Sequence, residues 1–237
     1  MRNPLRDWAR RSEELLDDPR ADADVVVASL RDIARINSLF GGAAAAAARV
    51  DEFLQSLPAG TTVSLLDVGT GAGDIPRAAS RRAARRGVTL RVIGLERILA
   101  AAREARRGGG AAVLVADGGL LPFASRSVDI VLCAKVLHHL PGEAGRRLLR
   151  EMDRVARRGV VVADIRRSAV AAAALWLASF PLRLHPVTRR DGVISVFRGF
   201  SGRELREICA GAGITVSVKR HPGWCLTAAW QPGTVPA

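Results

Sequence analysis

The run Leu65–Asp74 constrains the fold of this chain more than any other stretch. It begins with apolar residues, then carries Gly69, Gly71 and Gly73, and ends on an acid. Such a run predicts a buried strand that stops at a glycine-rich turn. Because glycine has no side chain, the backbone N–H groups of that turn can approach a ligand closely. The run therefore predicts a cradle for a nucleotide-like ligand at the end of a strand.

The spacing of these glycines decides between nucleotide ligands. A dinucleotide fingerprint reads Gly-x-Gly-x-x-Gly, and its third glycine lets the helix pack closely beside a pyrophosphate. Here Asp74 holds that third position, so an acid would face two phosphates and NAD is disfavoured. A P-loop is excluded because no Gly-Lys-Ser/Thr follows. What remains is a ligand with an adenosine and a charged amino acid but no phosphate, or a glycine-rich turn without a ligand.

From Thr62 onward, short apolar runs alternate with helical segments. This alternation predicts an α/β fold with a parallel sheet and right-handed crossovers. Two late runs, 214–220 and 225–230, are close enough to pair as antiparallel strands after a helix at 202–212. The earlier strands are predicted at 63–68, 90–95, 112–116, 128–133 and 159–164, with helices near 74–86, 97–107, 142–157 and 168–183.

The segment before the first strand is predicted to be helical. Ser12 precedes an acidic and apolar stretch and indicates one helix start, and Asp24 is expected to open a second segment through Leu39. A third helix is predicted over 43–57, ending at Pro58. We therefore expect an N-terminal helical extension or lid over 1–58 and the α/β domain over 59–237.

Composition bounds the class of protein. The 237 residues are 49% hydrophobic and 25% charged, which suits one soluble domain with an extension. The net charge is +13, and only two of the 36 basic residues are lysines. A positive surface can serve RNA, an anionic membrane or an acidic substrate, and a solvated arginine surface without a partner is the favoured alternative.

The cysteines and the apolar runs of the sequence indicate the cellular compartment in which the protein is expected. Cys133, Cys209 and Cys225 are too few and too scattered for a disulfide framework or a zinc site, which fits a reducing cytoplasm. The charged N-terminus lacks the apolar core of a signal peptide. The longest apolar run, 169–182, is shorter than a membrane span, so it is expected to pack on the sheet or to rest on a membrane surface. The oligomeric state stays open.

Acids stand where predicted strands end. Ligands of doubly wound sheets bind outside these carboxyl ends, so the acids are candidates for ligand contacts. Glu96 lies 22 residues beyond Asp74 and agrees with the distance of about 20 expected for a ribose-binding acid. Arg97 beside it is expected to stack on adenine or to point to water. Asp117 and Gly118 follow the third strand in the same way.

These features together resemble the class I S-adenosylmethionine-dependent methyltransferases. Asp67 through Gly73 match their motif I, acid-x-Gly-x-Gly-x-Gly, and residues 120–123 with 127–129 resemble their LPF…S.D passage. The resemblance covers about 60–230. It implies a doubly wound, mostly parallel seven-stranded Rossmann-like sheet with an antiparallel seventh strand. It also implies S-adenosylmethionine as cofactor and S-adenosylhomocysteine as product.

The resemblance assigns roles to individual residues. It implies that Asp67 holds the cofactor ammonium group through the loop or a water, that Glu96 accepts from the ribose diol, and that Asp117 receives the adenine amino group. The cofactor carboxylate is expected to meet Arg35 or Asn37, reaching down from the lid. The remaining residues expected to contact the cofactor are Gly69, Thr70, Gly71, Gly73, Arg97, Gly118 and Lys135.

The chemistry is expected at the end of the fourth strand. Methyl transfer is an in-line displacement, so the protein must align the nucleophile, exclude water and, for some acceptors, remove a proton. His138 and His139 are the candidate bases, with packing or cofactor contact as the alternative. No Asn/Asp-Pro-Pro-aromatic motif is present, and Cys133 lacks the Pro-Cys context of RNA C5 methylation. No metal site is expected, because the histidines lack i, i+4 spacing.

The acceptor is predicted from a narrower likeness. Residues 15–19, 37–42, 157–167 and 188–200 resemble bacterial methyltransferases of quinone and polyketide pathways. This implies a small aromatic acceptor, methylated at oxygen, in secondary metabolite biosynthesis. Alternatives are an RNA methyltransferase, a C- or N-methyltransferase of a small molecule, and a cofactor-binding protein without activity. The expected acceptor-binding residues are Trp176, Phe180, Phe197 and Arg198.

Overall fold

The computed structural model describes residues 4–18, 20–109 and 111–233, so short parts of the predicted extension over 1–58 and of the predicted domain over 59–237 lie outside the described residues. Seven strands form one sheet in the order β3-β2-β1-β4-β5-β7-β6, and only β7 runs antiparallel to its neighbours. This confirms the predicted fold class. The strands are β1 (Thr62–Val68), β2 (Thr89–Glu96), β3 (Ala111–Val115), β4 (Val128–Ala134), β5 (Ala156–Ile165), β6 (Ser217–His221) and β7 (Cys225–Trp230).

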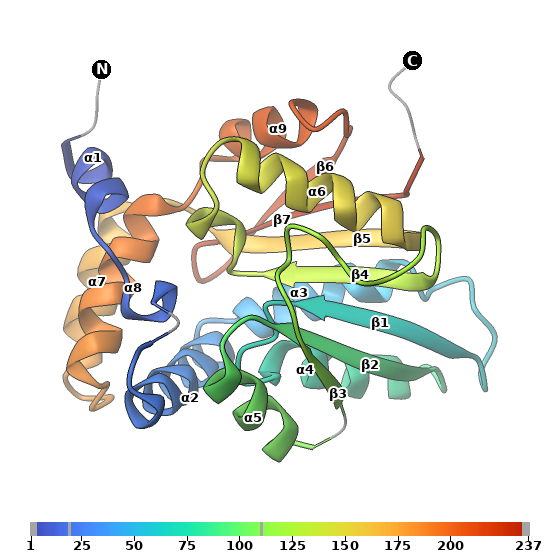
Figure 1. The fold of residues 1–237 in the computed structure, drawn as a ribbon, viewed down its shortest axis with the longest axis horizontal. Helices are drawn as coiled ribbons and strands as arrows, with labels where there is room; N and C mark the ends of the chain where they lie inside the picture. Colours follow the sequence, from blue (N-terminus) through green and yellow to red (C-terminus); the bar gives the residue numbers. More distant parts are fainter. Residues whose placement is uncertain (1–3, 19, 110, 234–237) are drawn as a thin grey trace.

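Helices cover both faces of the sheet (Figure 1). On one face α3 (Gly42–Glu52) and α4 (Asp74–Ala84) bury small and apolar side chains against β1, β4 and β5. On the other face α6 (Glu143–Val155) and α9 (Gly202–Ala210) pack on the same strands. Burial on both faces explains why these strands read as continuous apolar runs.

The strand order reverses between β1 and β4. From β1 the chain builds outward to β2 and β3, then returns to place β4 on the other side of β1. Loops leaving the carboxyl ends of these two strands diverge, which opens a crevice for a ligand. The sheet therefore places the glycine turn after β1 and the histidines after β4 at the same edge.

A helical cap covers that edge. In Figure 1 it lies at the left, where the strand arrows point. It combines N-terminal helices with helices from the segment between β5 and β6, since α8 packs against α1, α2 and α7. Its members are α1 (Pro4–Arg11), the 3-10 turn η1 (Leu15–Asp17), α2 (Ala23–Leu39), α7 (Ala169–Ser179) and α8 (Pro186–Arg198); α5 (Leu99–Arg107) lies beside α2.

Several predicted boundaries are wrong. Ser12 does not cap a helix; it follows α1, and its hydroxyl donates to the Trp8 carbonyl. Helix α2 begins at Ala23 because Asp22 is its cap and accepts from two backbone N–H groups of the first turn. Helix α8 was not predicted, since the Asp-Gly pair in its middle suggests a turn, yet Pro186 at its first turn and packing in the cap stabilise it.

The predicted domain boundary at residue 58 separates helix α3 from the elements against which it packs. Helix α3 shares a core with α4 and the central strands, through Ala46, Ala47 and Val50. We therefore propose that the extension ends near residue 41 and that α3 belongs to the α/β domain.

None of the helices within the described ranges has the length and apolar character needed to cross a membrane. Cys133, Cys209 and Cys225 are free and buried.

Candidate active site

One large cavity lies at the carboxyl edge of the sheet. Its volume is about 830 Å³, and its walls come from the loops after β1, β2, β3 and β4 together with η1, α2, α7 and α8. It thus contains both the strand-end residues predicted for a cofactor and residues of the cap. The predicted site residues that line it are Asn37, Gly69, Thr70, Gly71, Glu96, Arg97, Asp117, Gly118, Lys135, His138 and His139.

The glycine turn requires glycine for conformation and for space. Gly69, Gly71 and Gly73 have φ values of 70°, 53° and 70°, which other residues rarely adopt. A Cβ on Gly69 would lie 2.3 Å from a methyl carbon of Val136, on the loop after β4. The N–H groups of Gly69 and Thr70 both donate to the Leu95 carbonyl at the end of β2. The turn is therefore held against β2 and β4.

Glu96 ties the glycine turn to the end of β2. One carboxylate oxygen accepts from the Gly71 N–H at 3.0 Å. The other accepts from the N–H groups of Arg97 and Ile98, at 2.8 and 3.2 Å. The carboxylate is thus oriented by three backbone donors at the cavity wall. Asp117 is exposed, and its carboxylate accepts from the Gly119 N–H at 2.6 Å.

Asp67 lies beneath the turn and is 2% exposed. Burial, and next the charges of Asp74 and Glu96, raise the pKa of Asp67 to about 7. One of its carboxyl oxygens has no hydrogen-bond partner among the described residues, and neither has the Thr70 hydroxyl. Buried polar atoms without partners are rare and costly. Their position under the glycine turn is therefore typical of a site that a ligand or water completes.

The cap brings Asn37 to the site but not Arg35. The Asn37 amide donates to Asp74 at 2.9 Å, and its oxygen is buried without a partner within the described ranges. The Lys135 side chain passes beside Gly42 nearby, and burial lowers the pKa of its ammonium group. Arg35 is exposed and pairs with Asp32 one turn back on α2. The prediction for Arg35 is thus not supported by its position, because Asn37 lies on the inward face of the helix and Arg35 does not.

His138 forms a buried pair with Asp164. The His138 Nδ1 lies 2.7 Å from a carboxylate oxygen of Asp164, and the two side chains are 2% and 0% exposed. Burial alone would raise the pKa of Asp164, but His138 and the Ile165 N–H outweigh it and hold this pKa below its ordinary value. Since Nδ1 is engaged by the acid, Nε2 is the ring nitrogen free to act on a substrate.

Sequence reasoning missed Asp164. It stands at the end of an apolar strand, which is the signal that identified Glu96 and Asp117. The order of the strands makes the residue relevant, because β5 adjoins β4 and its end lies beside the turn that carries the histidines.

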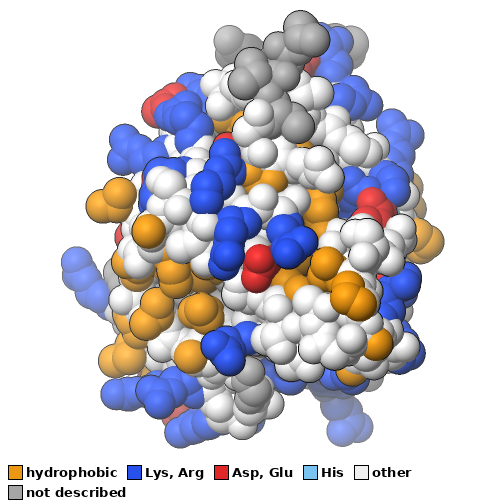
Figure 2. Space-filling view, turned by 90° about the vertical axis from the view of Figure 1, so that its right-hand side faces the viewer, with side chains coloured by type: hydrophobic (Ala, Val, Ile, Leu, Met, Phe, Trp, Pro, Cys, Tyr) orange, Lys and Arg blue, Asp and Glu red, His pale blue; other side chains and the backbone are white. Residues whose placement is uncertain are grey.

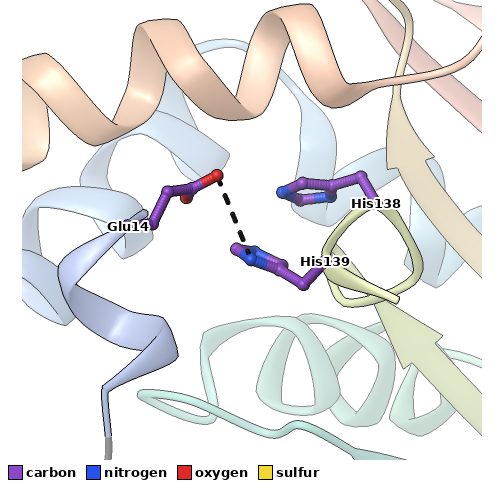
Figure 3. Close-up of side chains that lie close together, drawn as sticks. All are labelled: Glu14, His138 and His139. Carbon is purple, nitrogen blue, oxygen red and sulfur yellow. Dashed lines mark ion pairs between the residues drawn. The ribbon is translucent and has the colours of Figure 1, made fainter. Parts of the chain in front are cut away.

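A second charged cluster joins His139 to the N-terminal segment. His139 Nδ1 lies 2.8 Å from Asp17 and 4.0 Å from Glu14, as Figure 3 shows for the latter pair. Arg198 lies 3.0 Å from Glu14 and 2.9 Å from Asp17. Arg198 also donates to backbone carbonyls of the N-terminal segment, at Ala9 and Ser12.

The same cluster contains a group of side chains that suits a metal ion. Ligand-type atoms of Glu14, His138 and His139 lie within 4.8 Å of one another (Figure 3). Ser195 engages one oxygen of Glu14, and Asp17 engages His139 Nδ1, whereas the Nε2 atom of His138 stays free. The Arg198 guanidinium beside Glu14 would also repel a divalent cation. We therefore keep the prediction that the site uses no metal.

The four predicted acceptor residues do not line the cavity. Arg198 is occupied by the N-terminal segment, and Phe197 is buried in the cap core. Trp176 and Phe180 lie edge to face on the outer side of α7, 45% and 50% exposed. These residues were predicted because they are aromatic or cationic. Whether a side chain points into the cavity depends instead on the face of the helix that carries it. The cap residues that do line the cavity include Leu16, Leu30, Ile33, Ile36, Phe40, Ala171, Ala174, Leu175, Thr188, Asp191, Gly192, Ser195 and Val196.

Fold and site together define a class I S-adenosylmethionine-dependent methyltransferase. The sheet order with an antiparallel β7, the glycine turn after β1 and the acids at the strand ends all belong to this class. Residues 66–163 match the family described as a methyltransferase domain, which indicates an S-adenosylmethionine-dependent methyltransferase.

Several solved structures share the fold of this chain. A methyltransferase from Aquifex aeolicus is 20% identical, with a TM-score of 0.55 over 77% of this chain and 87% of its own. Magnesium protoporphyrin IX methyltransferase from Synechocystis, solved with bound S-adenosylhomocysteine, is 16% identical, with a TM-score of 0.53 over 85% and 84%. The pyocyanin biosynthetic protein PhzM is 18% identical, with a TM-score of 0.54 over 78% and 54%. No curated protein matches the sequence.

The residues at the site fit S-adenosylmethionine, the cofactor of this class. The ligand carries a sulfonium and an ammonium group, and the site offers the carboxylates of Asp67, Asp74, Glu96 and Asp117. We propose that Glu96 binds the ribose, Asp117 and Gly118 the adenine, and the glycine turn the amino acid part. Asn37 and Lys135 are proposed to hold its carboxylate. Arg97 instead donates to the Asp17 carbonyl and joins β2 to the N-terminal segment.

Replacing Glu96 tests the ribose assignment. We expect Glu96→Ala to weaken S-adenosylmethionine binding in calorimetry roughly 10- to 100-fold, because hydrogen bonds to a charged group contribute about 1.5–3 kcal/mol each. Glu207→Ala is the matched control, since that exposed glutamate lies on α9 and pairs with Arg203 outside the cavity. Equal affinity for wild type and Glu96→Ala would contradict the assignment.

Proposed function

We propose that this enzyme methylates a hydroxyl group of a small aromatic acceptor, of the kind found in polyketide or quinone pathways. The buried His138–Asp164 pair carries this proposal. It lies at the cavity wall, at the ends of the two strands beside the predicted cofactor loop. A phenol or enol becomes a strong nucleophile when its proton is removed, which is a role that a histidine oriented by an acid performs well.

The cap supports an apolar acceptor. Most cap side chains at the cavity are aliphatic or aromatic, such as Ile33, Phe40 and Leu175. A few polar groups of α8, including Thr188 and Ser195, stand among them and could orient a polar substituent. This pattern favours a flat apolar molecule with few polar groups over a nucleic acid backbone.

The proton and the methyl group move separately. Bound S-adenosylmethionine supplies an electrophilic methyl group on a positively charged sulfur. His138 Nε2 takes the proton of the acceptor hydroxyl, and Asp164 stabilises the imidazolium that forms through the bond at Nδ1. The acceptor oxygen bonds to the methyl carbon while the carbon–sulfur bond breaks. The products are a methyl ether and S-adenosylhomocysteine, and the proton later leaves to water.

Methylation of RNA is the second candidate, suggested by the charge of +13. A nucleic-acid enzyme of this kind needs a continuous basic surface. Many arginines here pair with acids of the same chain, for example Arg86 with Asp51 and Arg158 with Asp129. On the face in Figure 2 the basic side chains form separate groups with uncharged and apolar surface between them. These observations favour the small-molecule acceptor.

An acceptor screen tests the proposed function. The enzyme is incubated with methyl-labelled S-adenosylmethionine and a panel of phenols, hydroxyquinones, amines and total RNA. We expect the label to appear in phenolic or enolic compounds. Cleavage of ethers should release this label, which would show that the methyl group is bound to oxygen. Label in RNA alone would contradict the proposal, and label on carbon or nitrogen would replace O-methylation by the corresponding alternative.

A further inference from the structure

Helix α7 exposes an apolar face along its whole length. The exposed side chains follow helical spacing from Ala169 and Val170 to the end of the helix at Leu177 and Phe180. Val170 and Leu177 are each 68% exposed, and Trp176 and Phe180 about half exposed. The helix contains no charged residue. Contiguous exposed apolar surface of this kind marks an interaction site in soluble proteins.

The surroundings of this face are basic. From Ile165 to Arg190 the chain has no acid but carries Arg166, Arg167, Arg183, Arg189 and Arg190. Of these, Arg167 pairs with Glu204 and Arg190 with the neighbouring Asp191. Arg189 places its guanidinium 4.0 Å from the centre of the Phe180 ring, and the Arg190 side chain is 62% exposed. An apolar helix face with aromatic residues and an arginine rim is typical of helices that lie at an anionic membrane interface.

The opposite face of α7 borders the cavity. Ala171, Ala174 and Leu175 line it, so this one helix separates the exposed apolar surface from the predicted acceptor site. A partner that covers the outer face would therefore lie beside the route of an apolar acceptor. A lipid surface both matches the charge of the rim and dissolves such molecules.

We propose that the outer face of α7 is a docking surface for an anionic phospholipid bilayer. The apolar side chains of Val170, Trp176, Leu177 and Phe180 enter the headgroup region, and the arginines at the end of the helix contact lipid phosphates. The proposal does not depend on the identity of the acceptor, because docking is measured without one.

Vesicle sedimentation tests the docking surface. We expect the wild-type protein to sediment with phosphatidylglycerol vesicles. It should bind phosphatidylcholine vesicles at least about tenfold more weakly, since each basic residue near an anionic surface strengthens binding. The double variant Val170→Ser/Leu177→Ser should bind phosphatidylglycerol vesicles at least about tenfold more weakly, because two apolar side chains no longer enter the bilayer. It leaves the Trp176–Phe180–Arg189 group intact.

Controls separate docking from folding and from self-association. Leu39→Ser removes a leucine of similar exposure, 62%, from α2 and should bind vesicles like wild type. All variants should keep the wild-type affinity for S-adenosylmethionine in calorimetry. Absence of binding to phosphatidylglycerol vesicles, or equal binding by the double variant, would overturn the proposal. So would light scattering that shows a wild-type dimer separated by the double substitution, since the face would then join two copies of the chain.

Discussion

Replacing His138 with glutamine should reduce turnover of a phenolic acceptor by about 10²- to 10⁴-fold, the range for loss of a general base. Glutamine keeps hydrogen bonding near Asp164 but cannot take a proton at neutral pH. Binding of S-adenosylmethionine should change little, because the proposed cofactor contacts are made by other residues. The measurements are kcat with an acceptor found in the screen and cofactor affinity by calorimetry.

Two further variants distinguish a base from a packing residue. Asp164→Asn should also lower kcat, because an amide donating to Nδ1 would place the imidazole proton on Nε2, where the acceptor proton must go. His139→Gln should have a smaller effect, since that ring is engaged by Asp17 of the N-terminal segment. Unchanged kcat in His138→Gln would show that the acceptor needs no base at this position.

The strand-end residues were predictable because of the sheet. The strands β1, β2 and β3 are short apolar runs that end at or just before a glycine or an acid, so Gly69, Glu96 and Asp117 could be placed without knowing the packing of the cap. The same rule applies to Asp164, which sequence reasoning left unused. These residues are local signals whose meaning follows from one topological fact, the shared carboxyl edge.

The cap could not be read in the same way. Its helix α7 consists of alanine and other apolar residues except for Ser179, so the sequence does not show which face of this helix turns inward. Trp176 and Phe180 therefore seemed suited to a substrate, whereas Leu175 on the same helix lines the cavity. Arg198 was assigned to the acceptor, but its partners Glu14 and Asp17 lie about 180 residues away in the chain. Such long-range pairing has no local signature.

Replacing Asp67 with asparagine should stabilise the cofactor-free protein at high pH. Burial first, then Asp74 and Glu96, raise the pKa of Asp67 from 3.8 to about 7 in the folded state. The folded chain therefore holds this proton more tightly than the unfolded chain, and stability falls as pH rises from about 4 to about 7. The loss is on the order of 4 kcal/mol. Asparagine removes it, so the melting temperature at pH 8 should rise by roughly 5–15 °C, with little change at pH 4.

The same substitution should weaken S-adenosylmethionine binding if Asp67 balances the charge of the cofactor ammonium group. A more stable but poorly binding variant would show that the buried acid is kept for the ligand at a cost in stability. Asp129→Asn is the matched control. Ser64 bonds and nearby arginines outweigh burial and lower the pKa of Asp129, so this variant should lose stability at pH 8. Scanning calorimetry at pH 4 and 8 compares the two. If Asp67→Asn were also less stable at pH 8, the Asp67 carboxylate would be ionised and favourably paired in the free enzyme.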